Sequence, residues 1–206
     1  MRVAGLFTVF VCLTMGIHDS ASAVGPAAGA INTAFNTSAR FEALGSAGVG
    51  MPWGQDTNHW ANPALLAFRP GLHYQKFESQ LAVGLADDIY LYNEEASIGL
   101  FGVTFLLADD PVDGNYLDLG EQVATNENGE LVGTFNSWMR ARSWGVGVNL
   151  VELLENLSGK GHRPVSRYVS LAGGYVQTDY TDLLAPDWVL QDEHGGQATG
   201  QSRDWG

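Results

Sequence analysis

The stretch Ser143-Trp-Gly-Val-Gly-Val-Asn-Leu-Val151 alternates bulky apolar residues with small or polar ones. The bulky set is Trp144, Val146, Val148 and Leu150, and the other set is Ser143, Gly145, Gly147 and Asn149. Because a strand places alternate side chains on opposite faces, this stretch predicts a strand with one oily face and one small or polar face. Residues Val169–Gln177 repeat the pattern, with Val169, Leu171 and Tyr175 in the bulky set and Gly173 as a gap. A soluble β-sandwich and an outer-membrane barrel both alternate in this way, so the pattern alone leaves both open.

The first 23 residues have the features of a secretory signal peptide. Arg2 supplies the positive charge, Val3–Ile17 is the apolar region, and Ala21-Ser22-Ala23 is an A-x-A cleavage site. The apolar run is shorter than the roughly 20 residues that a membrane-spanning helix needs. We therefore predict a cleaved signal over residues 1–23 and an exported protein that begins at Val24.

The composition argues against several classes of protein. The one cysteine, Cys12, lies inside the predicted signal, so the exported chain has no disulfide and no cysteine chemistry. A net charge of −13 with only 10 Lys and Arg residues argues against nucleic-acid binding, which needs a basic surface. The 26 glycines and 11% aromatic residues favour a β protein with many turns.

Alternating segments from Leu72 onward predict antiparallel strands joined in up-and-down order. The turn signal Asn126–Gly129 predicts a hairpin, because Asn-Gly adopts positive φ at little cost. The apolar spacing in Leu150–Leu157 predicts a short helix capped by Asn149, with its leucines at a barrel mouth or on lipid. The predicted strands are Leu72–Ser79, Leu81–Ala86 with Ile89–Tyr92, Ala96–Leu107, Tyr116–Thr125, Glu130–Arg140, Ser143–Val151 and Arg167–Tyr180.

The sequence contains no recognisable catalytic or metal-binding motif. The acidic segment Asp109–Asn115 is predicted to be a loop tip, and it lacks the EF-hand spacing because Pro111 occupies the third position. The histidines outside the predicted signal are not spaced as a pair of metal ligands, and the sequence has no G-x-S-x-G motif. We predict a protein that is not an enzyme and that needs no cofactor and no metal.

Arginines and tryptophans share one set of alternating positions in the region of residues 138–144. Arg140 and Arg142 alternate in phase with Trp138 and Trp144. An arginine at the lipid midplane of a barrel costs about 2–4 kcal/mol, so this segment is predicted to lie at a membrane interface with the tryptophans in an aromatic girdle. The alternative is a soluble sheet edge with an arginine stacked on a tryptophan.

The N-terminal region contains three short motifs, Ser38-Ala39-Arg40, Ala43-Leu-Gly-Ser-Ala-Gly-Val49 and Trp60-Ala-Asn-Pro-Ala-Leu-Leu-Ala67. This set of motifs resembles the PorV/PorQ group of the FadL-type outer-membrane β-barrel superfamily. It is similar to the family pattern "ARA-x-GMGGA … WNPAGLA", and the Asn62-Pro63-Ala64 step is its most specific part. The segment Met51-Pro-Trp-Gly54 departs from the small residues that are usual there.

The resemblance implies an antiparallel up-and-down transmembrane β-barrel, truncated at its C-terminus, with residues 24–71 as an N-terminal hatch or plug and residues 72–206 as barrel strands. It implies a non-enzymatic protein of the outer membrane that contacts lipid and passes a hydrophobic molecule or docks exported cargo, as in type IX secretion. The hatch and ligand residues that it implies are Asn62, Pro63, Ala64, Trp53 and Trp60. The alternative from the residues alone is a soluble secreted β-sandwich or adhesin whose Trp and Tyr side chains bind a partner or a glycan.

Overall fold

The fold is a single antiparallel sheet, seen in a computed structural model that describes residues 32, 35, 43, 59, 62–84, 86–109, 112–159, 168–190 and 197–206. The predicted signal, Trp53 and Trp60 fall outside these described residues. The elements in chain order are η1 (Pro63–Phe68), β1 (Gly71–Gln80), β2 (Tyr90–Leu100), β3 (Val103–Ala108), β4 (Gly114–Thr125), β5 (Leu131–Asn149), α4 (Leu150–Ser158), β6 (Ala172–Leu183), α5 (Asp187–Leu190) and β7 (Gln197–Trp205).

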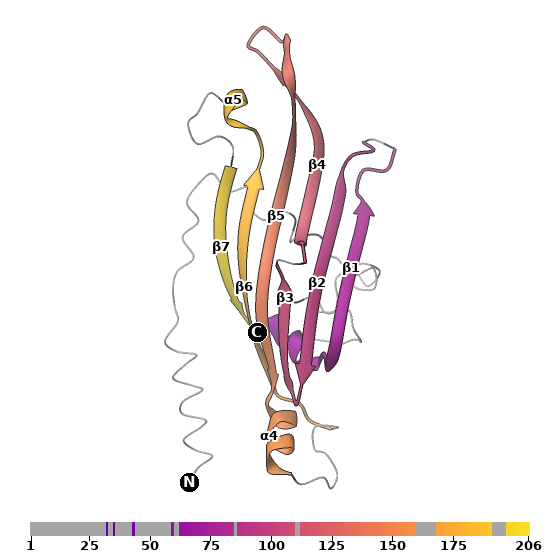
Figure 1. Ribbon diagram of the computed structural model, residues 1–206, viewed down its shortest axis with the longest axis vertical. Coiled ribbons are helices and arrows are strands. Elements are labelled where there is room, and N and C mark those ends of the chain that lie inside the picture. The colour runs from indigo at the N-terminus through magenta and orange to yellow at the C-terminus, as the bar shows by residue number, and fades with distance from the viewer. Residues whose placement is uncertain are drawn as a thin grey trace.

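The sheet has the up-and-down order that the sequence predicts. The order is β1-β2-β3-β5-β6-β7, and β4 pairs with β2 and β5. Because β3 and β4 run in the same direction between β2 and β5, they act as one interrupted strand. Every pair is antiparallel, which confirms an all-β fold. The pairings among the described residues do not join β1 to β7, so they leave closure into a barrel open (Figure 1).

The prediction of one strand over Ala96–Leu107 is wrong. Phe101 and Gly102 form a two-residue turn between β2 and β3, with φ of 55° and 82°. Positive φ at both central positions is the geometry of a tight hairpin, which Asn-Gly usually supplies. The sequence places a bulky phenylalanine there, and the turn therefore carries no recognisable signal.

Other strand boundaries also differ from the prediction. Residues 81–84 form a bend and turn rather than a strand, and Gly84 has a φ of 81°. The two segments predicted on either side of Ala141-Arg142 are one 19-residue strand, β5, because those two residues continue the alternation. The segment Asp109–Asn115 is described at Asp109 and from Val112 onward, where Gly114 and Asn115 already belong to β4, in the middle of the sheet rather than in a loop.

The predicted helix and hairpin are confirmed. In α4 the side chain of Asn149 accepts from the Glu152 amide at 3.3 Å, and Gly159 has the left-handed conformation that ends a helix. At the β4–β5 hairpin the Asn126 side chain accepts from the amides of Asn128 and Glu130 at 3.0 and 2.9 Å. Figure 1 places the hairpin and α4 at opposite ends of the sheet, so the two elements mark the ends of its long axis.

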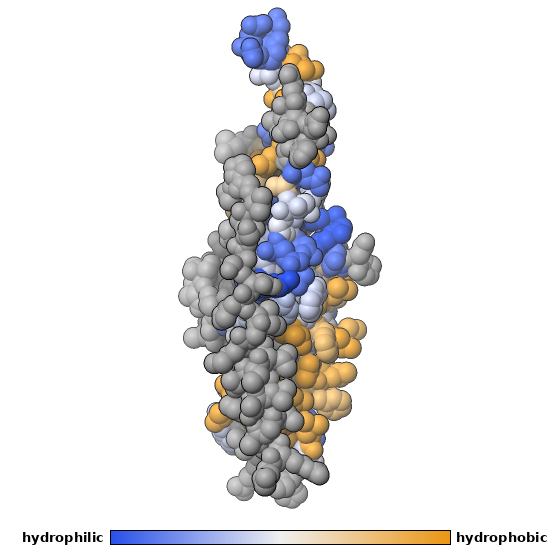
Figure 2. Space-filling view, turned by 90° about the vertical axis from the view of Figure 1, so that its left-hand side faces the viewer, coloured by the Kyte–Doolittle hydropathy of each residue, from blue (hydrophilic) through white to orange (hydrophobic). Residues whose placement is uncertain are grey.

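The two faces of the sheet differ in the way that the alternation predicts. One face, called here the covered face, carries Glu95, Ser97, Thr104, Ser143 and Gly147, which are all buried. The opposite face, called the bulky face, carries the large apolar side chains that are half-buried or exposed, whereas Leu91, Leu106, Leu117 and Met139 are buried on the covered face. Figure 2 shows hydrophobic side chains gathered on one side of the lower half of the molecule, below a band of hydrophilic ones.

Candidate functional site

The Asn62-Pro63-Ala64 step begins a short 3-10 helix that lies against the covered face. Asn62 caps this helix, η1, because its side chain accepts from the Ala64 amide at 3.0 Å, and Pro63 occupies the first turn. The helix contacts β3, β5 and β6, and its Leu66 packs with Leu106 and Val176 in a small apolar cluster (Figure 1). The three residues are thus brought together on the sheet, whereas Trp53 and Trp60 lie outside the described residues.

Glycines of β5 and β6 allow η1 to lie close to the sheet. A Cβ atom at Gly147 would lie 2.7 Å from both the carbonyl carbon and the Cβ of Leu66, and one at Gly145 would lie 3.2 Å from the Leu66 Cδ1. A Cβ at Gly174 would overlap the Pro63 carbonyl in the same way. The glycines that alternate with bulky residues in the sequence therefore form the surface on which η1 packs.

Adding one methyl group to this surface is expected to be costly. We expect Gly147→Ala to lower the free energy of unfolding by about 1–3 kcal/mol, because the helix must shift away from β5. Denaturant unfolding followed by tryptophan fluorescence measures the change. Gly200→Ala in β7 is the matched control, because a Cβ there would have no neighbour within 4 Å. Equal stabilities of the two variants would show that η1 does not pack on β5.

A buried cluster of three ionisable side chains ties the N-terminal segment to β2. The Arg69 Nη1 lies 2.7 Å from the Glu95 Oε1, and the His59 Nδ1 lies 3.3 Å from the Glu95 Oε2. These side chains are at most 2% exposed. The Arg69 carbonyl also accepts from the Thr104 hydroxyl at 3.2 Å. A carboxylate so deeply buried needs its opposite charge, because an unpaired charge away from water is very unfavourable.

Besides two small apolar clusters, the covered face carries many buried polar side chains. The Ser143 and Thr178 hydroxyls lie 3.0 Å apart across β5 and β6, and the Asn32 side chain donates to the Asn115 carbonyl at 3.4 Å. Interiors of soluble domains are dominated by apolar side chains, and buried polar groups there are the exception. The buried polar side chains on this face include Asn93, Glu95, Ser97, Thr104, Asn115, Ser137, Ser143, Asn149, Thr178 and Asp182.

The bulky face carries a row of apolar side chains that runs across the sheet from β1 to β7. The cross-strand partners in this row are Leu72, Ile98, Phe105, Val146, Tyr175 and Trp205. Leu72 is 82% exposed, and Phe105 is 58% exposed. A neighbouring row contains Leu100, Val103 and Val148. Apart from Leu106 and Val176, which pack with Leu66, the larger apolar side chains near the α4 end of the sheet therefore lie on the bulky face.

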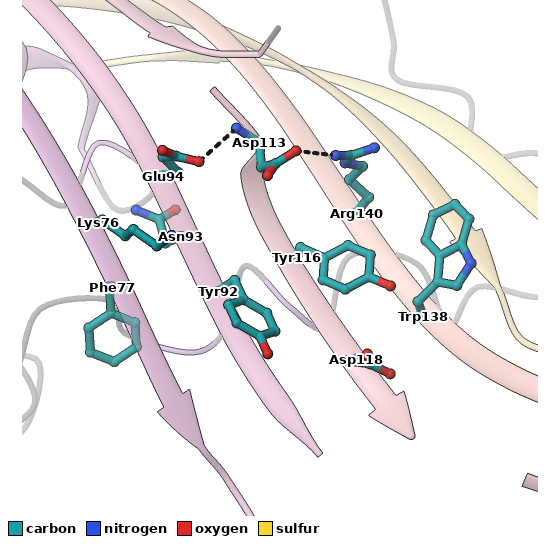
Figure 3. Close-up of a pocket in the computed structure, with 10 residues that line it drawn as sticks. All are labelled: Lys76, Phe77, Tyr92, Asn93, Glu94, Asp113, Tyr116, Asp118, Trp138 and Arg140. Carbon is teal, nitrogen blue, oxygen red and sulfur yellow. Dashed lines mark hydrogen bonds and ion pairs between the residues drawn. The ribbon is translucent and has the colours of Figure 1, made fainter. Parts of the chain in front are cut away.

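Next to these apolar rows, further from α4, the bulky face becomes aromatic and charged. Tyr92, Tyr116 and Trp138 follow one another across β2, β4 and β5, with ring centroids 6.1 and 6.0 Å apart. Arg140 lies over the Tyr116 ring at 5.9 Å. It also pairs with Asp113 at 2.7 Å (Figure 3). We call this set of residues the aromatic band.

The predicted grouping of arginines and tryptophans on one face is confirmed. Trp138, Arg140, Arg142 and Trp144 all lie on the bulky face of β5. The stacking partner of Arg140 is a tyrosine rather than a tryptophan. The acidic residues between β3 and β4 face these arginines, because Arg142 pairs with Asp109 at 3.3 Å and Arg140 pairs with Asp113.

Sequence reasoning missed the buried ion cluster. The signal that was available is the pair Glu94-Glu95 inside a strand, because adjacent residues of a strand face opposite sides. One of these carboxylates had to lie on the covered face and needed a basic partner. The partner, Arg69, lies 26 residues away in the sequence, and no local spacing indicates it.

Comparisons of the chain with protein-family models, curated proteins and solved structures gave no match. Among the described residues, no helix has both the length and the apolar character needed to cross a membrane. A proposal of function therefore rests on the geometry of the two sheet faces.

Proposed function

We propose that this chain forms part of an exported outer-membrane β-barrel whose bulky face contacts lipid and whose covered face lines the interior. The observation that carries the proposal is the reversed polarity of the sheet. Many of the side chains buried on the covered face are polar, among them serines, asparagines and the Arg69–Glu95 pair, whereas Leu72, Phe105 and Trp205 are exposed on the bulky face. The buried apolar side chains of the covered face form two small clusters, one with Leu66 and Leu106 and one with Leu91 and Leu117. Outer-membrane barrels have this apolar-out, polar-in alternation.

The size of the exposed apolar row supports lipid as its contact. Fully burying one large apolar side chain contributes roughly 1.5–3 kcal/mol. Six such side chains in one row would forgo about 9–18 kcal/mol if they all faced water completely, which is comparable to the net stability of a whole domain. An apolar environment on the bulky face removes this penalty.

Within the barrel, η1 acts as part of a hatch. Its start, Pro63-Ala64, packs on Gly174 of β6, and its Leu66 and Ala67 pack on the glycines of β5. The Arg69–Glu95 pair fixes its C-terminal end. The function that this arrangement supports best is the passage of a hydrophobic molecule or the docking of exported cargo, without catalysis. Both functions require an interior segment that is held in place but can be displaced.

A soluble secreted β-sandwich that acts as an adhesin is the second candidate. The aromatic band favours it, because tyrosine and tryptophan side chains beside carboxylates also suit a glycan-binding surface. In that protein the apolar rows would pack against another protein layer instead of lipid.

Membrane fractionation separates the two candidates. The full-length protein, expressed in a Gram-negative host, is expected in the detergent-soluble outer-membrane fraction. Its electrophoretic mobility is expected to change on boiling, as it does for folded barrels. A periplasmic marker and a resident outer-membrane protein serve as controls. Recovery of the protein in the soluble periplasmic fraction, with no change of mobility, would contradict the barrel and favour the adhesin.

A further inference from the structure

The aromatic band contains a cavity of about 630 Å³ on the bulky face of the sheet. The Tyr92, Tyr116 and Trp138 rings lie side by side across three strands, and Asp118 lies next to them (Figure 3). At the other end of the cavity, Glu94 accepts from the Asp113 amide at 3.4 Å.

The charges of the cavity are balanced at one end and unbalanced at the other. Arg140 is paired with Asp113, and Lys76 is the cross-strand partner of Glu94. Asp118 accepts from the Gly120 amide at 2.9 Å, and no ion pair with it occurs among the described residues. A carboxylate beside three aromatic rings is suited to an organic cation, because the faces of the rings attract positive charge.

The order of these groups along the strands matches the order within a zwitterionic lipid headgroup. On β5, Arg140 lies four residues from Trp144, on the side away from the apolar rows. Arg140 is therefore about 13 Å further from these rows than Trp144 is. Trp138 lies beyond Arg140, and Asp118 is its cross-strand partner. The basic groups are therefore nearer the apolar rows and the unbalanced carboxylate is further away. In a phosphoethanolamine lipid, the phosphate likewise lies nearer the acyl chains than the ammonium does.

We propose that this cavity binds the headgroup of a phosphoethanolamine lipid, with the ammonium between Asp118 and the aromatic rings and the phosphate on the side of Arg140. The choice of a lipid as the source of the ammonium group rests on the proposed membrane location. The recognition of the ammonium group itself rests only on the cavity.

Short-chain lipids in detergent solution test the site without a membrane. The purified full-length protein is titrated with dihexanoyl phosphatidylethanolamine, and the tryptophan fluorescence is followed. We expect saturable binding and at least about 10-fold weaker binding of dihexanoyl phosphatidylglycerol, which has no ammonium, because a charge-assisted hydrogen bond is lost. Free O-phosphoethanolamine, the headgroup without chains, is expected to bind more weakly than the lipid.

Variants separate this site from general adsorption. Asp118→Asn keeps an oxygen for the Gly120 amide and is expected to weaken phosphatidylethanolamine binding about 10-fold. Tyr116→Leu is expected to weaken it several-fold. Asp179→Asn is the matched control, because Asp179 is an exposed carboxylate on the bulky face in β6. We expect this variant to bind phosphatidylethanolamine as the parent protein does.

Equal affinities for the two lipids, or an unchanged affinity in Asp118→Asn with the folded mobility retained, would overturn the site. Equal affinities for O-phosphoethanolamine and the lipid would overturn the lipid as its occupant. A soluble periplasmic protein in the fractionation experiment would instead refute the membrane location, and this titration would still report on the cavity.

Discussion

Replacing Arg69 with methionine is expected to lower the free energy of unfolding by about 3–5 kcal/mol, because it leaves the buried Glu95 carboxylate without its guanidinium partner. The residue is 2% exposed, so water cannot take the place of the lost partner. Urea unfolding in phospholipid vesicles, followed by tryptophan fluorescence, measures the loss. Because Arg69 directly follows η1, the variant is also expected to release the N-terminal segment from the sheet and to make it sensitive to protease.

Two further variants show whether the cost arises from the buried charge. Lys76→Met removes an exposed cation from the bulky face of β1 and is expected to cost less than about 1 kcal/mol. The double variant Arg69→Met/Glu95→Gln removes the uncompensated charge and is expected to regain a large part of the stability. A cost for Arg69→Met no larger than that for Lys76→Met would show that the Arg69–Glu95 pair does not hold the segment in place.

Placing an arginine at position 146 is expected to make folding into a bilayer less favourable by about 2–4 kcal/mol. Val146 lies in the middle of the apolar row, and this cost is typical of arginine near the midplane of a barrel. Urea titration of the variant and the parent protein in vesicles gives the difference. The penalty arises from hydrocarbon, so its size depends on depth along the strand.

Thr181→Arg is the matched control for Val146→Arg. Thr181 lies on the same face of the sheet, is the cross-strand partner of Arg140, and belongs to the level of the aromatic band. There an arginine can reach headgroups and water, so we expect a cost of about 0–1 kcal/mol. Equal costs at the two positions would mean that the bulky face has no depth-dependent apolar surroundings.

Local patterns in the sequence predicted the parts of the fold that depend on local physics. The alternation in Ser143–Val151 correctly separated the covered face from the bulky face, because the side-chain period of a strand is two. The helix over Leu150–Ser158 and the turn at Asn126–Gly129 were predicted because their caps and turn residues lie within a few positions. The strand pairing followed from short connections between neighbours in the chain.

Features that depend on distant residues were not predicted. The turn at Phe101-Gly102 has no favourable turn residue at its first position. It is held by the end of β5, since the Gly102 carbonyl accepts from the amide of Asn149, the N-cap of α4, at 2.7 Å. The glycines at 145 and 147 are required by η1, which packs against them and which no local pattern in β5 indicates. Likewise the Arg69–Glu95 pair joins residues that no short motif connects.

The resemblance of the N-terminal region gave a prediction of a different kind. It singled out Asn62-Pro63-Ala64 as part of an interior segment, and these residues lie on the covered face of the sheet. That position is compatible with a hatch, but the assignment to a family and the role of the segment stay predictions. The structural reason for the motif is local, because Asn62 caps η1 and Pro63 fits its first turn.

The proposal that the bulky face contacts lipid is tested most directly by the surroundings of the side chain at position 146. The one cysteine, Cys12, lies in the predicted signal, so Val146→Cys and Ser143→Cys each give a single site for a nitroxide label in the processed protein. In vesicles, we expect the label at 146 to be relaxed strongly by oxygen, which dissolves in acyl chains, and weakly by a water-soluble nickel complex. The label at 143, on the covered face, should be shielded from both. Strong relaxation by the nickel complex at 146, or equal shielding from both reagents there, would contradict a lipid-facing sheet.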